Sequence, residues 1–535
     1  MSKARIFFSF LRNPEEIFYI RDFLRNDDGF MKEFLLPKAN DTGKQVHPAM
    51  KARRKLMQDA ILVLSKSRRF RWLIARTLRC RQVYCLPAAL EITAQELEAL
   101  KPRGIIIASE GHGPDALQGL DAGLLSADTP ILALGGAAAL MCSRLGGGTG
   151  AELGQSGAVT LGLENDRLFD GITGGERILH GALELELPDA LQPLATATER
   201  VIGFRHKTLP LYAVQYPIER NDPDSAQLLY NFACSICGCR DDWTDEAIVD
   251  QSVEQLRQTA PEGRVLCAVS GGVDSAVCAR LASLAVGNRL VCVFVDTGLF
   301  REGEPDEVIR TFLDTMGLAV AHVDARETFL RALSGVSGWD DKERIASQLM
   351  TQVLRKQLQY DPDIHTLVLG TNFNDRQFGY SAEASVEGLR ICQPIASLFK
   401  DEVRRLASAM ALPDRIVQRQ PFPSSGLALR VMGVVTEERL NLLRTADACF
   451  TEEIREGGYD RRLWQYYATL VDSPDRPEAY AVCLRAVQAQ QDGAIAARLP
   501  FDVLERTAIR IRQTLPCISR VVYDLTPSAH YGELE

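Results

Sequence analysis

The 535-residue sequence contains no long apolar run, since no segment reaches the roughly 18 apolar residues that a membrane-spanning helix needs. It also has no excess of basic residues, because 70 Asp and Glu outnumber 61 Lys and Arg and the net charge is −9. A negative net charge argues against binding to nucleic acid or to an anionic membrane. Cysteine is sparse, with 13 residues, so we expect free thiols in a cytoplasmic enzyme and not a disulfide scaffold.

The first part of the chain divides into two segments that differ in their pattern of apolar residues. Residues 1–57 show no clean apolar period and are predicted to be an N-terminal extension. Beyond them, apolar runs at 61–64 (ILVL), 104–108 (GIIIA) and 130–134 (PILAL) are separated by helix-length segments. Strands that alternate with helices predict an α/β domain with a parallel sheet, which we place at 58–225.

A second α/β pattern follows a polar, acidic connector. The runs RVLCAVS, LVCVFVD, LAVAHVD and TLVLG predict another parallel sheet within 226–418. The sequence pattern changes again near PFP at 421–423. Beyond this point, helix-like segments and the strand-like run SRVVYDL predict an α+β region at 419–535. The predicted fold class is therefore α/β, with two doubly wound parallel-sheet domains and a smaller α+β domain.

The most informative segment is RVLCAVSGGVDSAVCARLA at 264–282, in which an apolar strand passes through a short turn into a helix. The turn consists of Ser270, Gly271, Gly272, Val273, Asp274 and Ser275. Glycine lets the backbone approach an anion closely, and N–H groups at the start of a helix bind phosphate. The serine hydroxyls can donate hydrogen bonds, and Asp274 can help to hold Mg²⁺ beside the phosphates. The lysine of a Walker A loop is missing, so the segment predicts a phosphate-binding loop of another kind.

Other strand ends supply polar residues for the same site. Asp296 ends the run LVCVFVD, Gly370 and Thr371 stand at the end of the run TLVLG, and Asp375 follows as a second candidate metal ligand. In an open α/β sheet a ligand lies across the carboxyl ends of the strands. Lys400, in SLFKDEVRRLA, is predicted to lie on a helix, where its charge can stabilise a phosphate leaving group.

The turn SGGVDS resembles the pyrophosphatase loop of the N-type ATP pyrophosphatases, which cut ATP between its α and β phosphates and pass AMP to a carbonyl oxygen. From about residue 58 onward the chain resembles the glutamine-hydrolysing GMP synthetase family. The motifs that carry this resemblance are NFACSICGCRDDW (231–243), SGGVDS (270–275), FVDTGLFR (294–301), FKDEVR (399–404), PFPSSGLALRVMG (421–433), CLRAV (483–487) and SRVVYD (519–524). The resemblance implies a class I glutaminase domain, an ATP pyrophosphatase domain that uses ATP and Mg²⁺, and a C-terminal domain that forms a homodimer.

The resemblance also implies a role for each residue of the loop region. The residues expected to hold ATP are Ser270 to Ser275, Asp296, Gly370 and Thr371, and the residues expected to act in catalysis are Asp274, Ser275 and Lys400. Asp274 and Asp375 are expected to hold the metal. A lid that closes over the nucleotide is expected between about 377 and 390.

The glutaminase part departs from the family at its reactive positions. The segment PILALGGAAALM places Gly135 where the family has its nucleophilic cysteine, and AVQYPIE places Pro217 where the family has its general-base histidine. Only the glutamate of that strand, Glu219, is kept. Neither glycine nor proline has a side chain that can attack or take a proton, so the domain is predicted to be folded but inactive as a glutaminase. Cys142, near the turn, is a weak substitute nucleophile.

The acceptor side departs from the family as well. The family stretch KSHHNVGG is replaced by residues 381–388, and the C-terminal tail that carries a lysine for the XMP phosphate is replaced by PSAHYGELE. Ser424 and Ser425 also replace family residues. We therefore expect an enzyme that adenylylates a small acceptor other than XMP, for attack by ammonia or another nucleophile. The alternatives are an ammonia-dependent GMP synthetase and a non-enzymatic protein that binds ATP or serves as a scaffold.

Overall fold

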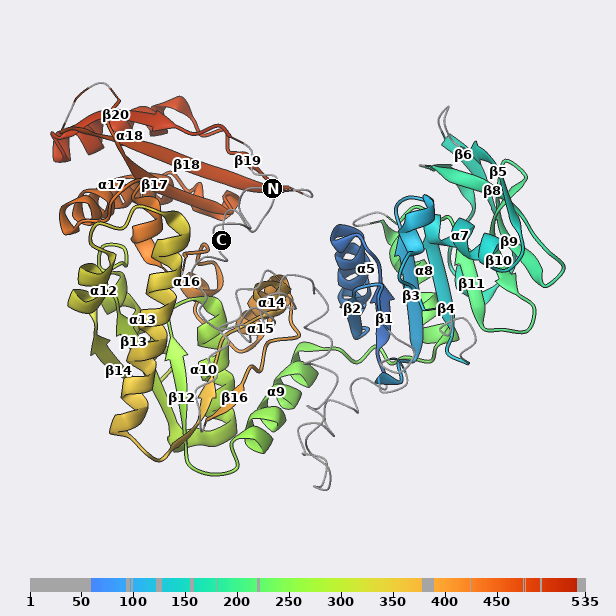
Figure 1. The fold of residues 1–535 in the computed structure, drawn as a ribbon, viewed down its shortest axis with the longest axis horizontal. Coiled ribbons are helices and arrows are strands. Elements are labelled where there is room, and N and C mark those ends of the chain that lie inside the picture. Colours follow the sequence, from blue (N-terminus) through green and yellow to red (C-terminus); the bar gives the residue numbers. More distant parts are fainter. Residues whose placement is uncertain are drawn as a thin grey trace, which may run out of the picture. The chain divides into compact units, whose positions relative to one another are not determined.

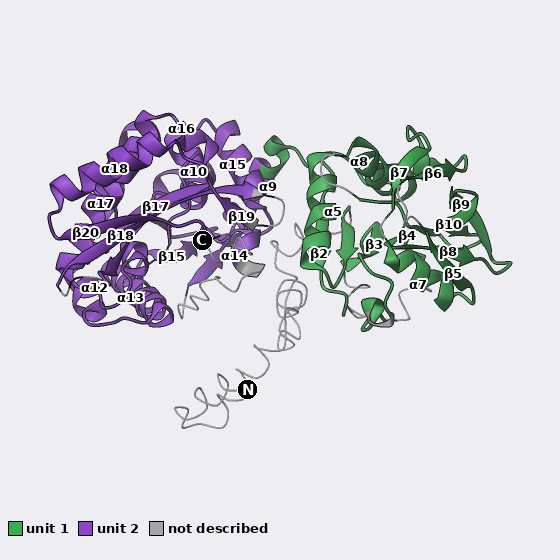
Figure 2. Ribbon diagram, turned by 90° about the horizontal axis from the view of Figure 1, so that it is seen from above, with its two compact units in different colours: residues 1–248 green, residues 249–535 purple. Residues whose placement is uncertain are grey.

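A computed structural model describes residues 59–92, 97, 100–121, 128–153, 158–179, 181–218, 222–377, 389–423, 425–474, 476, 478–490 and 493–526. The predicted extension 1–57, Glu219, most of the predicted lid, Ser424 and the C-terminal tail lie outside these residues. The chain forms two compact units, Met1–Ile248 and Val249–Glu535 (Figure 2). Within the described part of the chain, no helix is both long enough and apolar enough to cross a membrane.

The first unit is built on a nine-stranded sheet with the strand order β2-β1-β3-β4-β11-β10-β9-β6-β7 (Figure 1). Its strands are β1 (Ile61–Leu64), β2 (Cys85–Ala88), β3 (Gly104–Ser109), β4 (Ile131–Gly135), β6 (Ala158–Leu163), β7 (Gly175–Ile178), β9 (Leu191–Ala197), β10 (Arg200–His206) and β11 (Leu211–Val214). A separate pair is formed by β5 (Gly148–Leu153) and β8 (Ala182–Glu186). The first five strands in the sheet order are parallel and the others antiparallel, a change that the apolar runs did not predict.

Three expected strands of this unit, β1, β3 and β4, are confirmed. Every residue of β1 and β3 is buried, as a continuous apolar run in a parallel sheet predicts. The helices are α5 (Arg68–Cys80), α7 (Gly136–Arg144), α8 (Pro223–Tyr230) and α9 (Asp245–Thr259), which crosses into the second unit. The helix α5 begins where Ser67 Oγ accepts a hydrogen bond from Phe70 N (3.2 Å), and it buries Phe70, Ile74 and Leu78.

The second unit begins with a fully parallel sheet in the order β14-β13-β12-β15-β16. Its strands are β12 (Arg264–Val269), β13 (Leu290–Asp296), β14 (Val320–Asp324), β15 (Ile364–Val368) and β16 (Arg390–Cys392). Its helices are α10 (Val273–Val286), α11 (Glu304–Arg310), α12 (Arg326–Leu333), α13 (Trp339–Tyr360), α14 (Phe373–Gln377), α15 (Lys400–Ala409) and α16 (Asp414–Val417). The α/β prediction is confirmed, and β12, β13, β14 and β15 lie at the expected runs.

The last part of the chain forms a mixed sheet with two helices. Its elements are α17 (Glu437–Glu456), β17 (Gln465–Asp472), β18 (Tyr480–Gln490), β19 (Gly493–Ala496), α18 (Phe501–Thr514) and β20 (Ile518–Tyr523). The long strand β18 pairs antiparallel with β17 and β19 and parallel with β20. The expected α+β character of this region is therefore confirmed.

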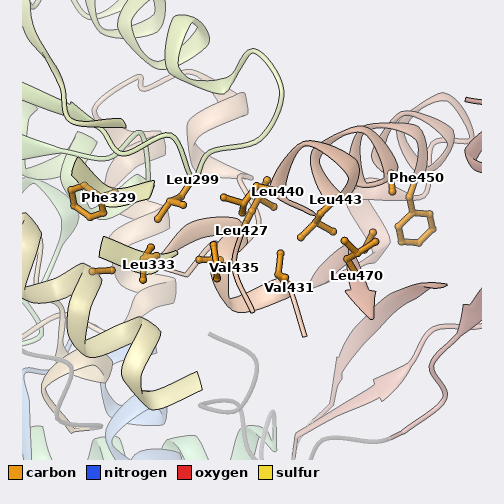
Figure 3. Packing of buried hydrophobic residues seen from close by; sticks show 14 of the residues in the cluster. Leu299, Phe329, Leu333, Leu427, Val431, Val435, Leu440, Leu443, Phe450 and Leu470 are labelled. Atoms are coloured by element: carbon orange, nitrogen blue, oxygen red, sulfur yellow. The ribbon is translucent and has the colours of Figure 1, made fainter. Parts of the chain in front are cut away.

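One hydrophobic core connects the parallel sheet to this C-terminal part. Figure 3 shows a row of buried side chains that runs from Leu299 and Phe329 through Val431 to Leu443 and onward. These side chains come from the segment after β13, from α12, from the segment before α17 and from α17 itself. The apolar surface of each part is thus removed from water by the other.

A buried lysine reinforces the same junction. Lys342, in α13, is 2% exposed, and its Nζ donates hydrogen bonds to the carbonyl oxygens of Val431 (2.6 Å) and Gly433 (2.9 Å). Burial, with a smaller effect of nearby Arg439, lowers the pKa of this ammonium group. The segment that leads into α17 is therefore held by main-chain hydrogen bonds as well as by apolar packing.

Candidate active site

The turn between β12 and α10 has a tightly packed glycine and an uncapped helix start. Gly271 has φ +77°, and a Cβ there would lie 2.3 Å from Val308 Cγ2 and 2.4 Å from Arg419 Nη1, so only glycine fits. The N-cap of α10 is Gly272, which has no side chain, so the first N–H groups of the helix are left without a side-chain cap. Uncapped N–H groups at a helix start are donors that an anion such as phosphate can accept from.

The two serines of the loop bond mainly to the loop itself. Ser275 Oγ accepts a hydrogen bond from Ser270 N (3.2 Å) and donates one to the carbonyl oxygen of Gly272 (3.0 Å). Ser270 Oγ lies 3.3 Å from Ser275 Oγ and accepts from Gly272 N at 3.4 Å. These bonds fix the curvature of the turn, which places its N–H groups.

The end of β15 lies directly against the start of α10. A Cβ on Gly370 would lie 3.1 Å from Ser275 N, a contact closer than most side chains tolerate. The neighbouring Thr371 is buried, and its hydroxyl accepts a hydrogen bond from Gln393 Nε2 (3.3 Å). Gly370 therefore lies against the loop as expected, whereas the hydrogen bond of Thr371 is to Gln393, outside the loop.

Asp274 is the meeting point of three elements. Its Oδ2 is in direct contact with Nζ of Lys400, the first residue of α15, and its Oδ1 accepts from Asn372 Nδ2 (3.4 Å). The carboxylate and the ammonium group are both partly buried, so their attraction is screened less than that of an exposed pair. The structure thus brings together Asp274 and Lys400, two residues that the motifs predicted for one site.

Asp375 forms a second carboxylate beside the first. Its Oδ2 accepts from Asn372 N (3.0 Å), and its own N–H donates to Asn372 Oδ1 (3.1 Å). The pKa of Asp375 is raised to about 6, mainly by burial and also by the charge of Asp274, while the hydrogen bonds of Asn372 and the charge of Lys400 act in the opposite direction. Two carboxylates that repel each other next to a phosphate loop are suitable ligands for Mg²⁺.

Asp296 has different neighbours. Its Oδ1 accepts from Gly298 N (2.9 Å), while its Oδ2 lies 3.7 Å from His322 Nε2 and 3.8 Å from Arg326 Nε. The carboxylate therefore shapes the turn after β13 and faces two basic side chains. It lies at the same strand-end edge as the loop but bonds to another group of residues.

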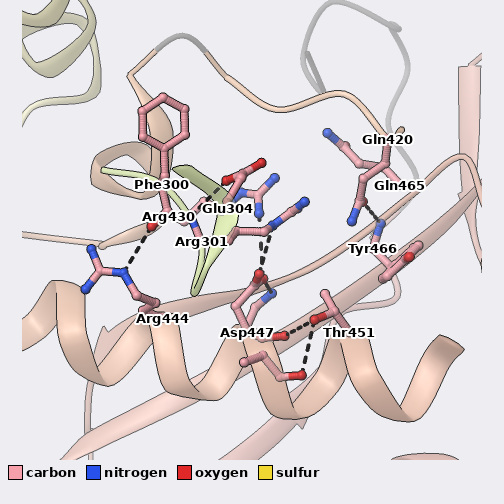
Figure 4. A network of polar contacts seen from close by, with 12 residues as sticks. Phe300, Arg301, Glu304, Gln420, Arg430, Arg444, Asp447, Thr451, Gln465 and Tyr466 are labelled. Atoms are coloured by element: carbon pink, nitrogen blue, oxygen red, sulfur yellow. Dashed lines mark hydrogen bonds and ion pairs between the residues drawn. The ribbon is translucent and has the colours of Figure 1, made fainter. Parts of the chain in front are cut away.

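A cluster of arginines around the buried Asp447 was not foreseen from the sequence (Figure 4). Arg301 Nε donates to Asp447 Oδ2 (3.0 Å), and Arg430 Nη1 lies 3.6 Å from Asp447 Oδ1. The ring of Phe422 lies 4.8 Å from the guanidinium carbon of Arg301 and 5.0 Å from that of Arg430. Arg430 is 4% exposed, and burial, together with the charge of Arg301, lowers its pKa to about 10.

These arginines have unused donors. The buried Nη1 and Nη2 of Arg430 and Nη2 of Arg301 have no hydrogen-bond partner among the described residues. Buried polar groups normally find partners, and two guanidinium groups share one carboxylate here. This arrangement suits an anionic ligand group. Both arginines lie in motifs that were visible in the sequence, but motif spacing gives no information on burial or on missing partners.

The first unit retains the strand–turn–helix elbow without a nucleophile. Gly135 has φ +61° and ψ −133°, and a Cβ there would lie 2.4 Å from the carbonyl oxygen of Ser109. A Cβ on Gly136 would lie 2.1 Å from the carbonyl oxygen of Gly111. The strained turn thus persists, and the neighbouring backbone fills the space that a reactive side chain would need.

Cys142, the substitute nucleophile expected near the elbow, is not activated. Burial raises the pKa of Cys142 to about 11, with a smaller contribution from Glu186, and its Sγ faces the carbonyl oxygen of Glu186 (3.6 Å). A thiol with a raised pKa is a poor nucleophile. The carbonyl oxygen of Pro217 accepts a hydrogen bond from Ser225 Oγ (3.0 Å), which is a structural contact.

The chain is similar in sequence to known proteins along most of its length. The family model described as NAD synthase matches residues 246–448, and that of the GMP synthase C terminal domain matches residues 452–530. The chain is 35% identical over 505 residues to the glutamine-hydrolyzing GMP synthase of Bacillus cytotoxicus, which covers 88% of this chain and 98% of the relative. It is also 35% identical to that of Bacillus thuringiensis subsp. konkukian, with 88% and 97% covered.

The parallel sheet, its glycine loop and these matches define an ATP-dependent carbon–nitrogen ligase. Within that class, the chain belongs to the GMP synthase family, as its motifs indicated.

Proposed function

We propose that this protein uses ATP to adenylylate a carbonyl oxygen of a small acceptor, and that ammonia or another nucleophile then displaces AMP. The observation that carries the proposal is the direct contact between Lys400 and Asp274 beside the uncapped start of α10. In this reading the N–H groups of the loop hold the terminal phosphates, and Lys400 stabilises the charge that develops on pyrophosphate. Asp274 and Asp375 would hold Mg²⁺, which neutralises phosphate charge when it is bound.

We further propose that the protein does not hydrolyse glutamine. Covalent glutamine hydrolysis needs an activated nucleophile, and Gly135 offers none. The backbone oxygen of Ser109 lies only 2.4 Å from the position that the Cβ of such a residue would take, which supports a pocket closed by its own chain. Nitrogen would then come from free ammonia.

The acceptor is proposed to carry an anionic group that binds Arg301 and Arg430. The replaced stretch at 381–388 and the replaced tail support an acceptor other than XMP. The arginine pair, however, favours a second candidate function, ammonia-dependent synthesis of GMP from XMP, because XMP carries a phosphate that would satisfy the unused donors.

The decisive experiment measures AMP and pyrophosphate released from ATP, Mg²⁺ and ammonium, with and without XMP. Turnover that requires XMP supports the second candidate, and turnover with another anionic carbonyl compound supports the first. ATP binding without turnover for any acceptor would indicate a scaffold. Asp274→Asn should abolish turnover, whereas Asp314→Asn, which changes an exposed carboxylate, should not. Glutamine in place of ammonium should give no product.

We also propose that the C-terminal part forms a homodimer. Several large apolar side chains of its last elements are exposed, notably Phe501 (77%) and Leu525 (70%), together with Ile509 and Val522. Water contact with such side chains is unfavourable, and a second copy would cover them. Light scattering should give twice the chain mass for the native protein, and Phe501→Glu should shift it toward the monomer. A monomeric native protein would refute this assembly.

A further inference from the structure

Arg419 connects the phosphate loop to a buried carboxylate. Its Nη1 donates a hydrogen bond to the carbonyl oxygen of Ser270 (3.2 Å), and its Nη2 is in direct contact with Glu304 Oε1. The Arg419 and Glu304 side chains are 17% and 9% exposed, so solvent screens their attraction only weakly. The contact joins the first residue of the loop to the first residue of α11.

The same carboxylate also holds the main chain of Arg301 (Figure 4). Glu304 Oε2 accepts a hydrogen bond from Arg301 N at 2.9 Å. The side chain of Arg301 continues the connection through Asp447 to Arg430. One unbroken series of polar contacts therefore leads from the loop to the buried donors.

At the loop, this series of contacts ends on the peptide group between Ser270 and Gly271, which is able to rotate. The C=O and N–H groups of a trans peptide point in opposite directions, so the bond from Arg419 to the Ser270 carbonyl also fixes the direction of the Gly271 N–H. Two consecutive glycines would otherwise let this peptide rotate at little cost. Arg419 thus acts as a positioning residue that keeps a phosphate donor in place.

We propose that the Glu304–Arg419 ion pair couples the two substrate sites, so that an anion on Arg301 and Arg430 strengthens the binding of ATP at the loop. An anion on these donors fixes the position of Arg301. The carboxylate of Glu304, which accepts a hydrogen bond from Arg301 N, is then fixed as well. Arg419, paired with Glu304, in turn holds the Ser270 carbonyl more firmly. Coupling of this kind is reciprocal, so ATP strengthens anion binding by the same factor. The inference rests on the proposed function for the anion site, but it concerns binding and not turnover.

The test measures the affinity for α,β-methylene-ATP with Mg²⁺ by calorimetry, with and without inorganic phosphate as the probe of the arginine site. For the native protein we expect phosphate to tighten the nucleotide by about 5-fold or more. Glu304→Gln and Arg419→Lys should each reduce this factor to about 1, and both should also weaken the affinity without phosphate, because Arg419 holds the loop. The matched controls Glu307→Gln, on the exposed face of α11, and Arg415→Lys should keep the full factor.

Arg430→Gln distinguishes phosphate bound at the arginine site from phosphate bound at the loop. It should remove the tightening, whereas phosphate that merely competes at the loop would weaken nucleotide binding equally in all variants. A native protein without tightening, or full tightening in both Glu304→Gln and Arg419→Lys, overturns the coupling. If one of these variants fails to fold, the other decides. Coupling without release of AMP would contradict only the proposed function, and release of AMP without coupling would contradict only this inference.

Discussion

Lys400 Nζ contacts Asp274 Oδ2 across a separation of 126 residues in the sequence. Replacing the cation by an apolar chain of similar length, Lys400→Met, removes the charge that would stabilise departing pyrophosphate. We expect the rate of AMP release at saturating ATP to fall by about 10²–10³-fold. Quenched-flow measurement of AMP formation checks this value. Lys356→Met, at an exposed position of α13, is the control, and a loss below about 5-fold for Lys400→Met would remove Lys400 from catalysis.

Gly135→Cys restores the missing thiol to the sequence, but the structure leaves no room for its side chain. The new Cβ would meet the carbonyl oxygen of Ser109, and φ at this position is +61°. We expect no glutamate release from glutamine, even together with Pro217→His, and a loss of stability of about 1–3 kcal/mol.

Gly146→Cys is a matched control for this change. Gly146 also has positive φ, but a Cβ there has no atom within 4 Å, so the variant carries backbone strain without the collision. It should be less destabilised in urea titrations than Gly135→Cys. Measurable glutaminase activity in Gly135→Cys would show that the pocket is open after all.

Gly271→Ala tests the close packing of the phosphate loop. The added methyl group would collide with Val308 and with Arg419 Nη1, at a φ of +77°. We expect ATP affinity to fall by more than about 10-fold, because the loop must move to admit the methyl group. Gly303→Ala, which has φ +67° and open space around it, should retain nearly native affinity. Equal affinities of the two variants in calorimetry would show that this close packing does not control ATP binding.

Asp375→Asn should change stability in a pH-dependent way. The folded pKa is about 6, raised from 3.8, so the fold disfavours the ionised carboxyl and is destabilised by it above about pH 6. Below about pH 4 the carboxyl is protonated in both states, and this cost is absent. The variant should therefore be more stable than the native protein at about pH 8, by at most about 3 kcal/mol, with the gain vanishing toward pH 4.

Urea unfolding midpoints across this pH range provide the measurement. Mg²⁺ with ATP should reduce or reverse the advantage of Asp375→Asn, because a bound cation favours the carboxylate. A stability difference that is independent of pH would mean that the carboxyl of Asp375 has an ordinary pKa in the fold.

The sequence predicts elements whose determinants are local. Local sequence determines the conformation of β12, β13 and the loop, through continuous apolar runs in the strands and glycines in the turn. The strand–turn–helix therefore lies where the sequence predicts it. Lys400 was identified because its motif is compact. By contrast, Arg419 and Glu304 stand 115 residues apart, and nothing near either residue indicates its partner. The closure of the elbow was equally hidden, because it depends on the backbone oxygen of Ser109 and not on a side chain.

The core shown in Figure 3 has a consequence for how such a chain can be divided and recombined. Leu299 and Phe329 pack in the same cluster as Leu443, so a cut near residue 419 would expose apolar faces on both fragments. The C-terminal part is therefore a poor module for transfer to another enzyme. Heat or urea should unfold the parallel sheet and the last helices in one transition. A substitution that weakens the packing of either part should therefore lower the stability of both.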